Sequence, residues 1–163
     1  MKILLTCILF AMILPLNAQE HLNRLGGGMN YWVAIDDISS ETDDDGFSYF
    51  ISYQRRPALL GWDLALEFLP DRFGDDALAP QFHLILGQGI YAAAGAGWVH
   101  QDGSFVDEPF FSFRAGLNFQ VVSGLFLDIF GNYRFNEKAD LSDSDTKIDT
   151  DTVFLGAALR ISL

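Results

Sequence analysis

The feature that most constrains this chain is a period of two in its apolar residues. Apolar side chains alternate with polar or small ones in five segments: 47–54, 60–68, 111–121, 125–136 and 153–163. Because successive side chains of a β-strand point to opposite faces, each segment predicts a strand with one apolar face. Phe126 and Phe130 depart from the alternation and fall on the polar face of their strand.

Three weaker segments bring the predicted strands to eight. Leu25–Ile35 alternates once its glycines are allowed for, Phe82–Leu86 flanks His83 with apolar residues, and Ile90–Trp98 is rich in Ala and Gly. In the third segment we expect Trp98 to face outward. No stretch after Ala18 has the eighteen apolar residues of a transmembrane helix.

The links between the segments alternate in length. Short links fall at 55–59, 87–89 and 122–124, and long links fall at 36–45, 70–79, 100–109 and 137–150. Outer-membrane barrels show this asymmetry, with the short turns on the periplasmic side. The predicted fold class is therefore all-β: an eight-stranded antiparallel up-and-down transmembrane β-barrel, with both termini in the periplasm.

The first residues predict a secretory signal peptide. Lys2 precedes an apolar run from Ile3 to Leu14, and a cut after Ala18 would leave Gln19 first. The run is too short to span a bilayer. The domain prediction is a signal peptide at 1–18 and a barrel at 19–163. Cys7, the single cysteine, lies in the signal, so the mature chain has no thiolate chemistry and no disulfide.

A soluble periplasmic barrel or sandwich is the main rival fold. Its outer strand faces would meet water and would normally carry lysine and glutamate. Lysine occurs only at positions 2, 138 and 147, so no predicted strand contains one. The apolar faces are instead rich in Phe, Tyr and Trp, as expected of a wall that meets lipid. We therefore expect a barrel in lipid.

Three stretches of the chain resemble a known group. They are the Gly/Ala-rich 89–98, Gly131-Asn132-Tyr133-Arg134-Phe135 and the final 154–163. In these patterns the mature chain resembles the small eight-stranded outer-membrane barrels of the OmpA, OmpX and opacity-protein kind. The resemblance implies their fold and a place in the bacterial outer membrane. Such barrels typically end in an aromatic residue, whereas this chain ends in Leu163.

The polar strand faces predict a charged lumen. They carry three carboxylates and three arginines: Asp63, Glu67, Asp128, Arg114, Arg134 and Arg160. We expect a packed network of ion pairs that fills the lumen, because buried charges must be compensated. Asp128, on the strand after that of Arg114, is the first candidate for its partner. A selectivity constriction or an acid/base site is the alternative interpretation of the same six residues.

The remaining polar residues predict neither catalysis nor a dedicated metal site. His83 should face the lumen as a hydrogen-bonded interior residue, and His100, Ser104 and Asp107 share a long link without matching an enzyme motif. Acidic runs at Asp43–Asp45 and Asp143–Asp151 lack EF-hand spacing, and we interpret them as solvated loops with at most weak contacts to divalent cations. No catalytic residue, metal site or cofactor is predicted.

Charge also limits the partners of this chain. A formal net charge of −12 disfavours nucleic acid, whose phosphates attract Lys and Arg. The expected partners are outer-membrane lipid, lipopolysaccharide and an unidentified extracellular molecule. The leading functional hypothesis is a structural or surface-interaction barrel that is not an enzyme. The alternatives are a narrow porin-like channel for small solutes and an outer-membrane lipid-modifying enzyme.

Overall fold

The computed structural model describes residues 22–34, 45–70, 76–101, 103–105, 109–135, 139–140, 147–148 and 152–163. The proposed signal peptide and most of the acidic runs, including Asp43, Asp44, Asp143 and Asp151, lie outside these residues. The eight long strands are β1 (Asn23–Ala34), β2 (Asp45–Arg55), β3 (Leu60–Leu69), β4 (Ala77–Gly87), β5 (Ile90–Gly97), β8 (Phe110–Val122), β9 (Leu125–Phe135) and β12 (Thr152–Ser162). In the described part of the chain, no helix has the length and hydropathy needed to cross a membrane.

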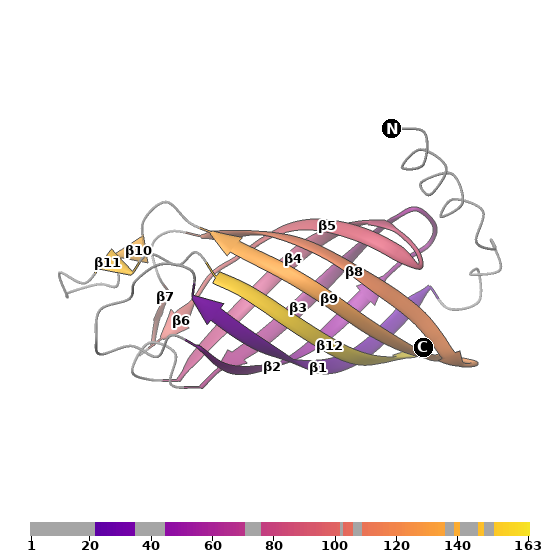
Figure 1. The fold of residues 1–163 in the computed structure, drawn as a ribbon, viewed down its shortest axis with the longest axis horizontal. Coiled ribbons are helices and arrows are strands. Elements are labelled where there is room, and N and C mark those ends of the chain that lie inside the picture. The colour runs from indigo at the N-terminus through magenta and orange to yellow at the C-terminus, as the bar shows by residue number, and fades with distance from the viewer. Residues whose placement is uncertain are drawn as a thin grey trace.

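The eight long strands form a closed antiparallel barrel. Each pairs with its neighbour in the chain, and β1 and β12 pair over eleven positions, from Arg24 opposite Ser162 to Ala34 opposite Thr152. The strands wind obliquely around the long axis (Figure 1). Closure leaves the long strands without an open edge, so every one of them has a hydrogen-bonding neighbour on both sides.

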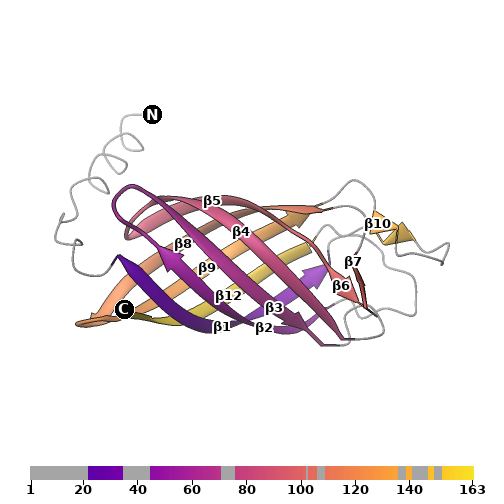
Figure 2. The same ribbon diagram turned by 180° about the vertical axis from the view of Figure 1, so that it is seen from behind.

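The two ends of the barrel differ. Short turns join β2 to β3, β4 to β5 and β8 to β9 at the end where β1 begins and β12 ends (Figures 1 and 2), which we call the turn end. We call the opposite end, where β1 ends and β12 begins, the loop end. Gly87 and Gly124 have φ of 111° and 79° in two of the turns, a backbone conformation that favours glycine. The Leu163 amide donates to the Asn23 carbonyl at 2.9 Å, which ties the C-terminus to β1.

The outer wall is apolar along all eight strands. Ile51 is 64% exposed, Leu86 61% and Leu155 63%, and Trp98 also faces outward, as the sequence predicts. Aromatic rings gather on β8 and β9 toward the loop end, where Phe135 packs against Phe111, Phe113 and Tyr133 with centroids 5.7 to 6.0 Å apart. In water such a surface would be a severe liability, whereas in hydrocarbon it is the expected wall.

β4 is much longer than the segment 82–86 that the sequence indicates. The link predicted at 70–79 is wrong at its end, because β4 already begins at Ala77 and runs through Pro80. The Pro80 carbonyl accepts from Trp98 N at 3.1 Å, just past the end of β5. In an antiparallel strand the N–H and C=O of a residue point to the same side, so the missing N–H of Pro80 costs no bond to β3.

Two of the predicted long links also contain short strands. Within 100–109, β6 (His100–Gln101) pairs with β7 (Ser104–Phe105). β6 also pairs with β4, where His100 lies opposite Leu78. Within 137–150, β10 (Ala139–Asp140) pairs with β11 (Lys147–Ile148). These two-residue pairs have no apolar periodicity, so a pattern of alternation has no means of detecting them.

A test of the lipid-facing wall compares one substitution at two depths. Leu64 lies halfway along β3 and is 49% exposed, whereas Leu60 lies at the turn end and is 62% exposed. Leu64→Arg should lower the free energy of unfolding by about 2–4 kcal/mol, and Leu60→Arg by about 0–1 kcal/mol, because the cost of a charge falls toward the interface. Urea unfolding in phospholipid vesicles measures both. Equal costs at the two positions would contradict the proposed depth of β3.

Candidate functional site in the barrel lumen

The polar faces of the strands point into the lumen and are buried there. Asp63, Glu67, Asp128 and Arg160 are 0% exposed, and Arg114 and Arg134 are almost as deeply buried. The structure therefore brings all six sequence-predicted lumen residues inside the barrel. It joins them in three ion pairs: Arg114 with Asp63 at 3.4 Å, Arg134 with Glu67, and Arg160 with Asp128.

Glu67 is the centre of the most extensive network. Its carboxylate pairs with Arg134, accepts from the Ser48 hydroxyl, and accepts from the side-chain amides of Asn30 at 2.7 Å and Gln81 at 2.6 Å. The donors come from four strands, β1, β2, β4 and β9. A buried carboxylate held by this many donors is compensated in charge and in hydrogen bonding. The network therefore connects strands rigidly across the lumen.

The predicted pairing of Arg114 with Asp128 is wrong. Arg114 on β8 reaches across the lumen to Asp63 on β3, whereas Asp128 pairs with Arg160. The register explains the exchange. Asp128 lies opposite Ala158 on β12, so Arg160 is its diagonal neighbour, whereas the residue of β9 opposite Arg114 is Asn132.

The lumen also contains two arginines that the sequence analysis does not place there. Arg24 on β1 donates to Asn118 Oδ1 at 2.8 Å, and Arg56, in the turn after β2, donates to the carbonyls of Gly87 and Gln88 at 2.9 and 2.7 Å. Both are buried. The expected balance of three charges of each sign is therefore wrong, since the described lumen holds five arginines and three carboxylates.

Desolvation lowers the pKa of the Arg56 guanidinium from its ordinary value, and the nearby Asp128 carboxylate opposes that shift. Arg56 is thus one of the excess cations. Its charge is supported by the turn carbonyls and by the nearby Asp128 carboxylate, which is itself paired with Arg160. Arg24 could have been found in the sequence, because it shares the inward face of β1 with Gly26, Gly28 and Asn30, each two residues from the next. A turn residue such as Arg56 has no periodicity to reveal its direction.

Four of the arginines pack over inward-facing aromatic rings. Guanidinium carbons lie 3.5 Å from the centroid of Phe126 for Arg24, 4.8 Å from Tyr91 for Arg56, 4.4 Å from Phe130 for Arg114, and 3.8 Å from Phe154 for Arg134. A planar guanidinium stacks well on an aromatic face and is attracted by its quadrupole. The contacts explain why Phe126, Phe130 and Phe154 face the lumen, although the other large apolar side chains of their strands face outward.

Inward-facing glycines make room for these large side chains. A Cβ added at Gly26 would come within 2.4 Å of the Arg160 side chain, and one added at Gly156 within 2.4 Å of the Phe130 ring. At Gly95 it would meet the His83 ring at 2.5 Å. The narrow lumen of an eight-stranded barrel is filled by side chains. Each of these three bulky residues lies directly opposite a glycine on the neighbouring strand.

An apolar cluster fills the lumen at the loop end. Its buried members come from β1, β3, β4, β8 and β12, with Val99 packed against them: Trp32, Leu69, Ala77, Ala79, Phe110 and Phe154. Trp32 is 1% exposed and Phe154 0%. This cluster lies directly beyond the Glu67 network, because Leu69 is two residues from Glu67 on β3 and Trp32 is two residues from Asn30 on β1.

His83 lies in the lumen at 0% exposure, and its Nε2 is 2.9 Å from the Ser112 hydroxyl, which is itself 1% exposed. The pair has the elements of a base and a nucleophile, but neither side chain reaches a surface. His100 and Ser104 lie on β6 and β7, where the His100 ring packs against Phe105 with centroids 4.8 Å apart. Asp107 lies outside the described residues.

The described residues contain no cluster of metal-ligating side chains. Among them, no three His, Cys, Asp or Glu side chains lie close enough together to hold a metal ion. The carboxylates of the acidic runs lie outside the described strands, apart from Asp45 at the start of β2, which accepts from the Tyr31 hydroxyl at 2.6 Å. In the lumen, the three described carboxylates are each paired with an arginine.

Comparison with known proteins agrees with this geometry. No family model and no curated protein matches the sequence. Among solved structures, the chain is similar to the crystal structure of Neisserial surface protein A, with a TM-score of 0.60 and 15% identity over 86% of this chain and 97% of that one. This chain has the fold of a small outer-membrane β-barrel. The outer membrane protein Ail of Yersinia pestis also matches, at 15% identity over 85% of this chain and 99% of that one, with a TM-score of 0.43.

A double-mutant cycle tests which carboxylate belongs to Arg114. Arg114→Ala should lower the free energy of unfolding by about 3–5 kcal/mol, because Asp63 is left as an uncompensated buried charge. Adding Asp63→Asn should recover part of the loss, with a coupling of roughly 0.5–3 kcal/mol. Asp128→Asn serves as the matched control, and urea unfolding is the measurement. Recovery by Asp128→Asn in place of Asp63→Asn would contradict the pairing described above.

Proposed function

We propose that this chain is a non-enzymatic outer-membrane barrel whose filled lumen acts as a rigid, non-conducting support for a surface that contacts molecules outside the cell. The observation that carries the proposal is the lumen itself. Three ion pairs and the apolar cluster at the loop end occupy it with buried side chains from six of the eight long strands. Export by a signal peptide at 1–18 is part of the same proposal.

The narrow channel is disfavoured by the way in which the lumen is filled. A solute path would have to pass both the Glu67 network and the adjoining cluster around Trp32 and Phe154. The charged side chains that would select an ion are bound to one another, and breaking one buried pair costs about 3–5 kcal/mol. Opening both the Glu67 network and the apolar cluster requires changes at several strands, which a rigid closed barrel resists.

The lipid-modifying enzyme is disfavoured by access. The described nucleophile-and-base pair, Ser112 and His83, is buried in the lumen and has no route to a lipid headgroup. A catalytic nucleophile must lie within reach of the atom it attacks. A structural role for this pair, in which each side chain satisfies the other, accounts for its burial.

The surface that we propose for contacts is the loop end. Six carboxylates fall between Asp36 and Asp45, and six more between Glu137 and Asp151, against Lys138 and Lys147. Carboxylates in such numbers favour divalent cations over anions, and the same cations bridge the phosphates of lipopolysaccharide. We propose weak, multi-site contacts of this kind with the lipopolysaccharide layer, in addition to an extracellular partner that the loops recognise.

Planar-bilayer recordings test the proposal. The folded protein should give no single-channel steps, and Arg114→Ala should remain non-conducting because it leaves the apolar cluster intact. A general porin reconstituted in parallel provides the positive control, and the lipid A mass spectrum of expressing cells should be unchanged. Regular conductance steps from the unaltered barrel would establish the channel instead, and a new lipid A species would establish the enzyme.

A further inference from the structure

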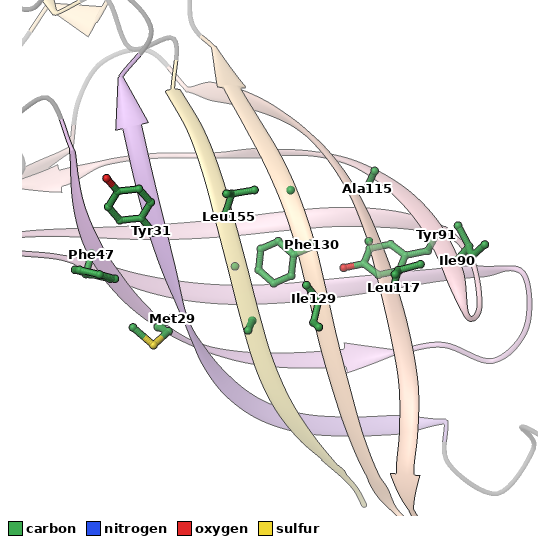
Figure 3. A pocket seen from close by; sticks show the side chains of 14 residues that line it. Met29, Tyr31, Phe47, Ile90, Tyr91, Ala115, Leu117, Ile129, Phe130 and Leu155 are labelled. Carbon is green, nitrogen blue, oxygen red and sulfur yellow. The ribbon is translucent and has the colours of Figure 1, made fainter.

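The lipid-facing wall contains a groove of about 700 Å³, halfway along the strands (Figure 3). Its lining extends from β5 across β8, β9, β12 and β1 to Phe47 on β2. Its floor is made by three small outward-facing residues on neighbouring strands, Ala115, Gly131 and Ala157. Bulky side chains border it, among them Leu117, Ile129 and Leu155.

The register of the sheet explains the shape of the groove. Gly131 lies directly opposite Ala115 on one side and Leu155 on the other, while Ala157 lies opposite Ile129. Ala157 is therefore the diagonal neighbour of Gly131, and the three small residues form a continuous path. Leu117 and Ile129 border the path toward the turn end, and Leu155 borders it toward the loop end.

The floor of the groove is open to the outside and packed from the inside. A Cβ built on Gly131 meets a single atom within 4 Å, Leu155 Cδ2 at 4.0 Å. Behind the floor, the Phe130 ring fits beside Gly156 and the Tyr91 ring fits beside Gly116. Inward side chains thus support the backbone of the groove, and the space on its outer side is left for a ligand.

The lining of the groove is almost wholly apolar. The hydroxyl of Tyr31, at one end, already donates to the Asp45 carboxylate at 2.6 Å. Tyr91 is 4% exposed, and its ring lies behind the floor. A ligand in the groove therefore meets methyl, methylene and ring carbons, which recognise a hydrocarbon chain and offer nothing to a polar group.

The width of the groove fits one chain. Outward side chains two residues apart on a strand are about 6.7 Å apart, so the bulky neighbours on the two sides of one small residue are about 13 Å apart. Their own thickness reduces this gap to about the width of a single methylene chain. A second barrel has a convex wall, which would meet the bordering leucines and isoleucine before it reached the floor. The groove is also continuous with the wall that already contacts lipid.

We propose that the groove across β8, β9 and β12 is a seat for one acyl chain of a membrane lipid, which this barrel retains in preference to the surrounding lipid. The inference rests on the proposed place of the barrel in the outer membrane. It adds a defined binding site to the outer wall of the barrel.

The experiment fills the groove and measures retained lipid. Gly131→Leu and Ala115→Leu both project into the trough. Ala94→Leu is the matched control, because Ala94 is also small and exposed on the outer wall, between Phe113 and Leu84, but does not line the groove. Native mass spectrometry of the folded protein in detergent, titrated with dipalmitoyl phosphatidylethanolamine, gives the affinity. Heat-modifiable migration of each variant verifies that it is folded.

The unaltered protein and Ala94→Leu should bind one lipid with equal affinity. Gly131→Leu with Ala115→Leu should bind it about tenfold more weakly, because the filled trough removes the van der Waals contacts of one chain segment. Equal binding by all folded variants would overturn the acyl seat alone. A dimer that Gly131→Leu dissociates would assign the groove to a second copy. A protein that folds only in water, without lipid or detergent, would overturn the membrane location itself.

Discussion

The rest of the structure depends on the pairing of β1 with β12. In hydrocarbon, an unpaired backbone N–H or C=O costs several kcal/mol, so a strand edge exposed to lipid is not tolerated. The first and last long strands meet over eleven positions, and Leu163 adds a further bond to Asn23. Because this seam closes the sheet, every long strand has one face toward the lumen and one toward the outside.

Closure with only eight strands then dictates what the lumen contains. The interior of such a barrel is just wide enough for side chains, so the polar faces must fill it and satisfy one another. Arginines do this by pairing with carboxylates and by packing over aromatic rings, as Arg134 does with Glu67 and Phe154. Glycines on the inward faces leave the space that these large groups require, as Gly26 does for Arg160.

Much of this could be predicted from the sequence, because a period of two is a local property of each strand. The outward position of Leu64 and the inward position of His83 follow from alternation alone. The choice of ion-pair partner across the lumen does not follow from alternation. Arg114 meets Asp63 from a strand three places away in the ring, which depends on the closed shape of the barrel. The turn residue Arg56 and the short strands β6, β7, β10 and β11 likewise lack a periodic signal, and the groove at Gly131 emerges only when the registers of three strands are combined.

Amide hydrogen exchange of the folded protein in phospholipid vesicles tests the closed seam most directly. The account predicts that the amides of β1 and β12 that bond to each other across the seam, between Gly26 and Asn30 and between Gly156 and Arg160, exchange as slowly as those of β8 and β9. Fast exchange along β1 and β12, with slow exchange confined to the strands between them, would show an open sheet and contradict the barrel.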